Sequence, residues 1–440
     1  MTTAAWKVAA VIGGVAIAAA MALVAWPHVR GARDVRDARS AQAVAQDEAG
    51  SIATPADVTL GAYLARAGNC EGCHTERGGR PYAGGRGIST PFGTVHSSNL
   101  TPDVTTGIGA WSQGDFWRAL HHGQSKDGRL LYPAFPYPEY TLVTRQDADA
   151  ILAFLRTQPA VTQANKAHQL RFPYNTQAAL AAWRILFFKP GVFEPDAKQS
   201  AHWNRGAYLV RGLGHCQACH APRNGLGATS GDVELSGGLI PMQGWYAPSL
   251  AASSEAGVAD WPTQDVVDLL KTGKSARGSA MGPMAQVVWR STQHLSQDDL
   301  HSMAVFLQQL PPQLPPQLRQ TAFEPAPSSK ADSSLLARGA IIYRDQCSAC
   351  HGEQGQGAGR AYAPLAGNRS VTMASPANLV RVIVSGGFLP ATAGNPRPFG
   401  MPPFGHTLSD ADIAAVATFV RQAWGNSAAP VPVLAVMRGR

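Results

Sequence analysis

The stretch Cys70-Glu71-Gly72-Cys73-His74 decides the fold, because its pattern C-x-x-C-H occurs at two further places in the chain. The other copies are Cys216-Gln217-Ala218-Cys219-His220 and Cys347-Ser348-Ala349-Cys350-His351. Together the three copies contain all 6 cysteines of the chain. Two cysteines three positions apart on a helix share one face, so both thiols can bond to the same group. The adjacent histidine can then project onto the centre of that group.

C-x-x-C-H is the pattern of covalent haem attachment. The two thiols add to the two vinyl groups of one haem as thioethers, and the histidine binds the iron. Covalent attachment holds the iron in place relative to its ligand, so little rearranges when an electron arrives or leaves. We therefore predict three covalently bound haem c groups, held by Cys70, Cys73, His74, Cys216, Cys219, His220, Cys347, Cys350 and His351.

Three other uses of the cysteines fit this pattern less well. A structural zinc site takes four ligands at close spacings, whereas the cysteine pairs lie far apart in the sequence. A thioredoxin-like pair would stand near a βαβ pattern, which the sequence lacks. Disulfides between such near neighbours would close very short loops and so would stabilise the fold little.

The composition is typical of a globular protein with several small domains. A length of 440 residues suits two to four domains of roughly 100–200 residues. With 45% hydrophobic and 15% charged residues, the chain is neither disordered nor fibrous. The net charge of +8 comes from scattered Lys and Arg, whereas nucleic-acid binding favours clusters on one face. We expect no nucleic-acid partner, and the propionates of three haems would neutralise most of the basic excess.

Each haem motif begins a repeat of similar length. A helix precedes each motif, and a further helix follows a capping pair in each repeat. The pairs are Thr144 with Asp147, Ser296 with Asp299, and Ser409 with Asp412. The sequence thus predicts an all-α fold with three tandem class I cytochrome c-like domains behind an N-terminal membrane helix. The three domains are residues 55–160, 200–310 and 333–425.

An uncharged stretch from Val8 to Trp26 follows Lys7 near the N-terminus. About 20 apolar residues span a bilayer as a helix, whereas the apolar part of a secretory signal is shorter. The length favours a retained anchor, although small residues near the end of the stretch keep cleavage possible. Residues 1–30 are therefore predicted to be a signal-anchor or a signal peptide, with the rest of the chain outside the membrane.

Two linkers and a tail complete the predicted organisation. Residues 161–199 form an apolar linker with aromatic residues such as Phe172 and Trp183. This linker either packs between haem domains or contacts a partner subunit or the membrane surface. Residues 311–332 are rich in proline and predict a semi-rigid spacer. Residues 426–440 form a tail that is apolar and then basic, and it could lie on the bilayer.

A low-spin electron carrier needs a second axial ligand, and a thioether sulfur raises the potential of the iron relative to imidazole. In the third repeat Met401 stands beside Pro402, shortly before the last capping pair. In the second repeat Met284 follows Pro283 at a similar position, with Met281 as its rival. We predict that Met284 and Met401 bind the second and third irons.

The first repeat departs from this pattern, because Phe135 stands where the sulfur is expected and a phenyl ring cannot bind iron. No methionine occurs between the first motif and Met242. The first haem therefore has another sixth ligand or an open site. His121 or His122 could reach the iron, whereas His96 is expected on the wrong side.

Two prolines are candidates to orient the histidine ligands. A backbone carbonyl at Pro248 or Pro364 could accept the Nδ1 hydrogen of His220 or His351 and so fix the imidazole. Ser98 replaces this proline in the first repeat.

The chain resembles the three-haem cytochrome c subunits of membrane-bound bacterial dehydrogenases, which oxidise alcohols, aldehydes, gluconate or similar sugars. The resemblance covers roughly residues 55–425. Besides the haem motifs it rests on Thr90-Pro91-Phe92-Gly93-Thr94, Asn99-Leu100-Thr101-Pro102-Asp103, Leu131 to Tyr137, Gly282-Pro283-Met284-Ala285 and Met401-Pro402-Pro403-Phe404. It implies the periplasmic side of the cell inner membrane, a catalytic dehydrogenase subunit as partner, and ubiquinone or a terminal oxidase as electron acceptor.

Two functions remain open from the sequence. The first is a relay that passes electrons from a periplasmic dehydrogenase to ubiquinone or the respiratory chain. No independent catalysis is expected, since no dinucleotide fingerprint follows a strand and no nucleophile triad is recognisable. The alternative is a haem enzyme whose open first haem acts as a peroxidase or reduces a small ligand.

Overall fold

The computed structural model describes residues 53–230, 234–311, 331–359 and 361–440. The predicted signal segment and most of the proline-rich linker lie outside these residues. No helix within these ranges is both long and apolar enough to cross a bilayer.

The chain divides into two units. One comprises Met1–Ile52 with Ser112–Gly114, and the other comprises Ala53–Trp111 with Asp115–Arg440. The second unit contains all three haem motifs, so the contacts among the repeats lie within it.

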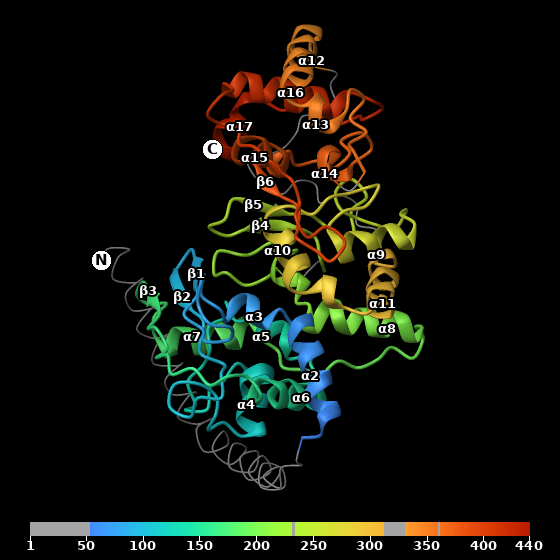
Figure 1. Cartoon of the computed structure of the whole chain (residues 1–440). Helices are drawn as coiled ribbons and strands as arrows, with labels where there is room; N and C mark the ends of the chain where they lie inside the picture. Colours follow the sequence, from blue (N-terminus) through green and yellow to red (C-terminus); the bar gives the residue numbers. More distant parts are fainter. Residues whose placement is uncertain (1–52, 231–233, 312–330, 360) are drawn as a thin grey trace, which may run out of the picture. The chain divides into compact units, whose positions relative to one another are not determined.

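Each repeat is built on a pair of crossing helices, one before its haem motif and one near its end (Figure 1). The pairs are α2 (Pro55–Ala67) with α6 (Arg145–Arg156), α8 (Ala201–Tyr208) with α11 (Gln297–Gln308), and α12 (Ser333–Gln346) with α16 (Asp410–Gln422). A Cβ added at Gly61, Gly206 or Gly339 would lie 1.8, 2.0 or 2.3 Å from a backbone oxygen of the partner helix. Each pair therefore crosses at a point where only glycine fits.

The expectation of an all-α fold is wrong, because the described residues include seven short strands in three small antiparallel sheets. The sheets are β1 (Gly87–Thr90), β2 (Gly93–His96) and β3 (Gln169–Leu170); β4 (Gly238–Ile240) and β5 (Trp245–Ala247); and β6 (Gly387–Phe388) and β7 (Gly400–Met401). The strands are two to four residues long, too short for the alternation of polar and apolar side chains that predicts a strand.

The remaining helices are short and connect these elements. They are α4 (Gln113–His122), α5 (Tyr137–Tyr140), α7 (Gln177–Phe187), α9 (Thr263–Thr272), α10 (Gly282–Arg290), α14 (Arg369–Thr372), α15 (Ala377–Ser385) and α17 (Val433–Gly439). A π-helical turn spans Leu209–Leu213, and a 3-10 turn spans Thr292–His294.

The three predicted capping pairs are confirmed. The side-chain oxygens of Thr144, Ser296 and Ser409 each accept a hydrogen bond from the backbone N–H of the aspartate three residues later, at 3.1–3.2 Å. In the third pair Asp412 also accepts a hydrogen bond from the backbone N–H of Ser409, at 3.3 Å. Only this pair of the three forms the full reciprocal capping box.

Asp147 and Asp299 use their carboxylates across the boundary between the first and second repeats. The Tyr63 hydroxyl of the first repeat donates to Asp299 at 2.5 Å, and the Tyr208 hydroxyl of the second repeat donates to Asp147. Arg205 adds two hydrogen bonds to Asp299, at 2.7 and 2.8 Å. Both tyrosines stand in a Gly-Ala-Tyr-Leu sequence, so the contact between the two repeats is reciprocal.

The first two repeats share one hydrophobic core, which runs from Leu64 to Leu310 and includes the fully buried Leu155 and Leu300. The third repeat has two smaller clusters of its own. The first and second repeats are therefore joined by their interiors as well as by the tyrosine–aspartate hydrogen bonds.

The predicted linker of residues 161–199 is attached to the first repeat. The Asn99 side chain donates to the carbonyl oxygen of Val161 at 2.8 Å, and β3 pairs with β2. Helix α7 buries Leu180, whereas Ile185 and Leu186 are 84% and 67% exposed. The helix thus packs on one side and exposes apolar side chains on the other.

The predicted tail packs on the third repeat. Ala435 and Val436 of α17 are buried in one of its core clusters, and Arg440 donates to Asp410 at 2.5 Å. Ala435 and Val436 of the tail are therefore buried in the interior of the protein.

Gly206→Ala tests the close crossing of α8 and α11. The new methyl group would lie 2.0 Å from the Ser302 carbonyl oxygen, so the helices must separate, at a cost of about 1–3 kcal/mol. We expect a lower melting temperature by circular dichroism. Gly225→Ala is the control, because no atom lies within 4 Å of its new Cβ. Equal melting temperatures for the two variants would contradict the crossing.

Tyr63→Phe tests the reciprocal contact. The change removes the hydrogen bond to the buried Asp299 carboxylate and the one that the Tyr63 hydroxyl accepts from the Ser296 N–H at 3.1 Å, a loss of about 1.5–3 kcal/mol. In a double-mutant cycle with Asp299→Asn, the two losses of stability should be non-additive. Tyr174→Phe is a matched control, since the Tyr174 hydroxyl has no hydrogen bond in the described part of the chain. Additive losses in the cycle would rule out the contact.

Candidate haem sites

Each C-x-x-C-H motif folds into one tight turn. These turns are α3 (Cys70–Cys73), a 3-10 turn (Cys216–Ala218) and α13 (Ser348–His351). In each, the histidine N–H donates to the carbonyl oxygen of the first cysteine, at 2.9 Å for His74, 2.8 Å for His220 and 3.0 Å for His351. The turn therefore returns the histidine to the first cysteine, as attachment to one haem requires.

A hydrogen bond from Nδ1–H to a backbone carbonyl fixes each histidine ring. The acceptors are Ser98 for His74 at 2.7 Å, Pro248 for His220 at 2.7 Å, and Ala363 for His351 at 3.0 Å. The prediction for Pro248 is confirmed. The prediction for Pro364 is wrong, because its carbonyl accepts instead from the Asn368 side chain at 2.8 Å.

These three imidazoles are in the state that suits a metal ligand. Burial lowers the pKa of His74, His220 and His351, and the carbonyl hydrogen bond opposes this only in part. A neutral ring that is protonated at Nδ1 carries its lone pair on Nε2, which is then available to bind iron.

The cysteines are in a different environment from reactive or zinc-binding cysteines. Burial raises the pKa of Cys70 and Cys216 to about 12 and that of Cys347 to about 11, whereas a thiolate nucleophile or ligand has a lowered pKa. All six cysteines are described and none forms a disulfide. Nor do the described residues contain a group of three His, Cys, Asp or Glu side chains that could hold a metal ion.

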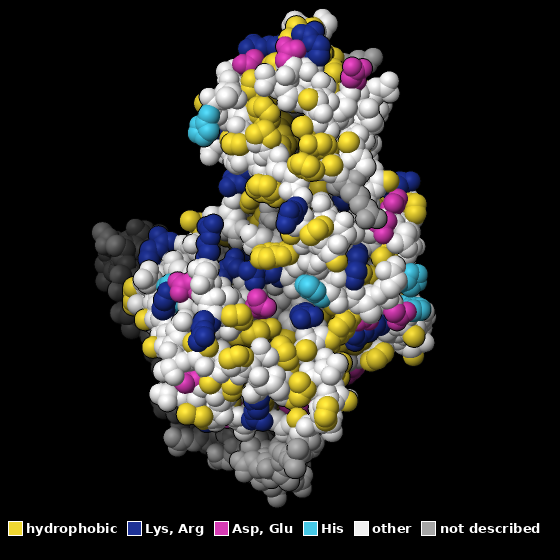
Figure 2. Space-filling view, in the orientation of Figure 1, with side chains coloured by type: hydrophobic (Ala, Val, Ile, Leu, Met, Phe, Trp, Pro, Cys, Tyr) yellow, Lys and Arg dark blue, Asp and Glu magenta, His cyan; other side chains and the backbone are white. Residues whose placement is uncertain are grey.

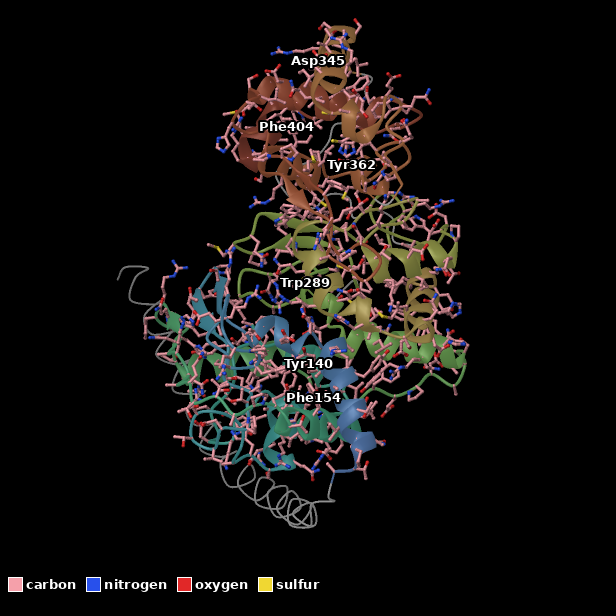
Figure 3. All side chains as sticks on the ribbon, in the orientation of Figure 1. Tyr140, Phe154, Trp289, Asp345, Tyr362 and Phe404 are labelled. Atoms are coloured by element: carbon pink, nitrogen blue, oxygen red, sulfur yellow. The ribbon has the colours of Figure 1, made fainter. Side chains whose placement is uncertain are left out.

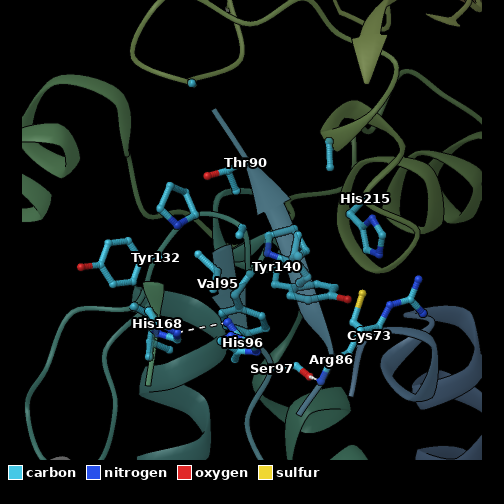
Figure 4. A pocket seen from close by; sticks show the side chains of 18 of the residues that line it. Cys73, Arg86, Thr90, Val95, His96, Ser97, Tyr132, Tyr140, His168 and His215 are labelled. Atoms are coloured by element: carbon cyan, nitrogen blue, oxygen red, sulfur yellow. Dashed lines mark hydrogen bonds between the residues drawn. The ribbon is translucent and has the colours of Figure 1, made fainter. Parts of the chain in front are cut away.

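A cavity of about 2590 Å³ opens beside the first motif and reaches the second (Figure 4). Its walls include Cys70, Cys73 and His74, and also Cys219. Well-packed protein interiors contain few voids larger than a water molecule, and ordinary ligand pockets measure roughly 300–1,000 Å³. The walls therefore fit a cofactor of porphyrin size at the first motif, with further room toward the second.

Basic side chains line the same cavity, where they could neutralise haem propionates. They are Arg86, Lys126, Arg129, Lys166, Arg223 and Arg290. Three of them also pair with acids: Arg129 with Asp127 at 2.7 Å, Lys166 with Glu76 at 2.7 Å, and Arg290 with Glu71 at 3.3 Å. That the haem propionates neutralise most of the basic excess stays a prediction.

The third repeat has a hollow bordered by hydrophobic side chains, which Figure 2 shows on the part of the surface that carries α15 and α16. Met401 and Phe404 pack against the core cluster of this repeat, and Figure 3 shows Phe404 and Tyr362 in this region. The Tyr362 hydroxyl lies within hydrogen-bonding reach of the Cys350 thiol. The attachment cysteine thus lies beside Tyr362 in this repeat.

The two methionines of the second repeat lie in different surroundings. Met284 packs against the core that the first two repeats share. Met281 Cε lies close to Gly387 of the third repeat, 3.2 Å from the point that a Cβ would occupy there. Met281 also lines a smaller cavity of about 530 Å³ with Trp289 and Phe388. Neither position tests which methionine binds the second iron, so ligation by Met284 and Met401 stays a prediction.

The candidate ligands of the first iron differ in whether they line the large cavity. Phe135 lines the large cavity, and so does His96, whose two ring nitrogens are buried and have no hydrogen-bond partner. His121 and His122 are not among the lining residues. The His121 ring stacks instead on Trp117, with centroids 4.4 Å apart. Of the three histidines, only His96 therefore faces the cavity.

Tyr140 and His215, which the sequence did not single out, lie between the first two motifs. The Tyr140 hydroxyl donates to the Gly68 carbonyl at 2.8 Å, and its ring meets that of His215 edge to face, with centroids 5.5 Å apart (Figure 4). His215 directly precedes Cys216, which is a signal that could have found it. Tyr140 carries no such signal, because Gly68 and His215 both lie more than 70 positions away from it in the sequence.

Comparison with known proteins agrees with this geometry. Residues 334–420 match the model of the family described as cytochrome c oxidase, cbb3-type, subunit III. The chain is 40% identical over 381 residues to the cytochrome c subunit of a quinone alcohol dehydrogenase from Gluconacetobacter polyoxogenes, covering 84% of this chain and 81% of the relative. It is 39% identical over 402 residues to the gluconate 2-dehydrogenase cytochrome c subunit of Pantoea cypripedii, covering 88% and 89%.

A third relative is the fructose dehydrogenase cytochrome subunit of Gluconobacter japonicus, 36% identical over 407 residues that cover 87% of this chain and 82% of the relative. Each of the three alignments covers more than 80% of this chain and of the relative. The chain therefore belongs to the family of c-type cytochrome subunits that serve dehydrogenases in electron transfer.

Proposed function

We propose that this cytochrome carries three haem groups and passes electrons from a catalytic dehydrogenase subunit to ubiquinone or the respiratory chain, on the periplasmic side of the inner membrane. Haem supplies one-electron iron chemistry when it is bound, and oxidation of the organic substrate belongs to the partner. Three equivalent turns, each with two thiols and an oriented imidazole, support the count of three. Attachment to C-x-x-C-H occurs outside the cytoplasm, and one relative is the subunit of a quinone enzyme; both support the location and the acceptor.

The closeness of the first two motifs carries the proposed relay. Cys73 lies near enough to Cys219 that its charge raises the pKa of the second thiol. Electron tunnelling falls steeply with distance, so groups attached at these cysteines would exchange electrons over a short path. The hydrogen bonds of Tyr63 and Tyr208 hold the two motifs in this relation.

The third repeat contacts the second next to the element that orients His220. Asn378 of α15 forms two hydrogen bonds with the backbone of Tyr246 in β5, at 3.0 and 2.7 Å. Pro248, whose carbonyl oxygen fixes His220, follows β5 directly. These contacts favour electron passage between the first and third haems through the second.

Replacing both cysteines of one motif tests the haem count. The Cys216→Ala/Cys219→Ala variant, exported and matured in a bacterial host, should lose the mass of one haem and retain the other two. Ser348→Ala changes an intervening residue of the third motif, and it should keep all three haems. Intact-mass spectrometry reads both results. A wild-type mass without porphyrin, or a mass of bound haem that the double substitution leaves unchanged, would contradict the proposal.

An open first haem is a second candidate function, which one observation favours. Phe135 lines the cavity at the first motif and its ring packs 5.5 Å from that of Tyr140. Its side chain has no donor atom, and the surrounding apolar wall would admit a small uncharged ligand. Binding or reduction of such a ligand at the first haem would then accompany the relay.

Carbon monoxide tests this second function. In the reduced wild-type protein, we expect a spectral shift of one haem in three. Phe135→Met supplies a thioether and should suppress the shift, whereas Phe135→Leu, which has no donor atom, should keep it. Absorption spectra with and without the gas provide the measurement. A wild-type protein whose spectrum does not respond would restrict the function to the relay.

A further inference from the structure

Glu139 is a buried carboxyl group of α5, the short helix that packs against the Leu209–Leu213 turn leading into the second motif, and the proposed relay does not use it. It lies in α5 and is 8% exposed. Within the described part of the chain it forms no ion pair, and the one N–H near its carboxylate, its own, also donates to the Pro136 carbonyl at 3.1 Å. An ionised carboxylate without a counterion is costly to bury and tends to become neutral by binding a proton.

Arg223 is the cation that faces Glu139, but its guanidinium group is engaged elsewhere. Nη1 donates to the Gly227 carbonyl at 2.7 Å, and Nη2 donates to the Ala218 carbonyl at 2.5 Å. Burial therefore outweighs the charge of Arg223 and raises the pKa of Glu139 to about 7. A carboxyl group in this state can change its protonation under physiological conditions.

The other ionisable groups around Glu139 come from its own helix and from the second motif. They are Tyr137, Tyr140, Cys216 and Cys219, and the negative charge of Glu139 raises the pKa of each. The tyrosines are neutral at pH 7, and the cysteines become neutral thioethers once haem is attached. Arg223 and the attached haem are then the charges that act on Glu139.

We propose that Glu139 binds one proton when the haem attached at Cys216 and Cys219 accepts one electron, and releases the proton when that haem is oxidised. The inference rests on the proposed haem at the second motif. The electron comes from the dehydrogenase and the proton from solvent, so an O–H bond forms on the carboxylate, and the carboxylate and haem together gain no net charge. In a medium of low dielectric constant this neutralisation is worth much more than in water.

Coupling of this kind makes the reduction potential depend on pH. The reduced state binds more protons, so low pH favours reduction and the potential falls as pH rises. Between the pKa values of Glu139 in the two redox states, a tenfold change in proton concentration corresponds to about 59 mV for a one-electron couple.

Redox titration of the full-length, haem-loaded protein with soluble mediators tests the proposal. Across the neutral pH range, the potential of one wild-type haem should fall by up to about 59 mV per pH unit. In Glu139→Gln that potential should be constant. Glu194→Gln removes an exposed carboxylate of the same type, and it should keep the wild-type slope.

Infrared difference spectra provide a direct measurement of the proton. The reduced-minus-oxidised spectrum should contain the C=O band of a protonated carboxylic acid in the wild type and in Glu194→Gln, and should lack it in Glu139→Gln. Glu139→Asp retains a carboxyl group and should retain a pH-dependent potential, so it keeps the proposal testable if Glu139→Gln folds poorly.

Two results would overturn the inference: wild-type potentials that do not change with pH, or a slope that Glu139→Gln leaves unchanged. Mediators deliver the electrons in this titration, so failure of a dehydrogenase to reduce the protein would not alter the outcome. A missing haem at the second motif would be visible in the mass of the protein and would count against the proposed function itself.

Discussion

Two tyrosine–aspartate hydrogen bonds between the first and second repeats determine the geometry on which the haem sites depend. Tyr63 and Tyr208 stand on the helices that lead into the first and second motifs, so their bonds to Asp299 and Asp147 position both motifs at once. The core that the two repeats share gives this arrangement an apolar interior. The nearness of the two attachment turns, and the burial of groups between them, follows from this pairing.

In the third repeat, the residues at the positions of these tyrosines and aspartates make different contacts. Ile341 occupies the position of the two tyrosines and is 53% exposed, and Asp412 keeps its carboxylate for its own helix cap and for Arg338. This repeat is stabilised from within, since the buried Arg421 donates to three backbone carbonyls at 2.8–2.9 Å. It can therefore contact the second repeat through other surfaces, such as Asn378.

Features that depend on neighbouring residues could be predicted from the sequence, and features that depend on distant residues could not. The attachment turns and the helix caps involve residues at most four positions apart, so their patterns are visible in the sequence. The carbonyl of Pro248 was predicted because the repeats align there, whereas Asn368 redirects that of Pro364. The short strands, and the burial of Glu139 beside a second motif, arise from packing between segments that are far apart in the chain.

The exchange of tyrosines also bears on the origin of the chain. A contact in which each of two similar units offers the same residue to the same site on the other is the isologous contact of a two-fold homodimer. Here Tyr63 and Tyr208 offer equivalent hydroxyls to the equivalent Asp299 and Asp147. This is the pattern that would remain if the gene of a small dimeric ancestor had been duplicated and its two copies fused.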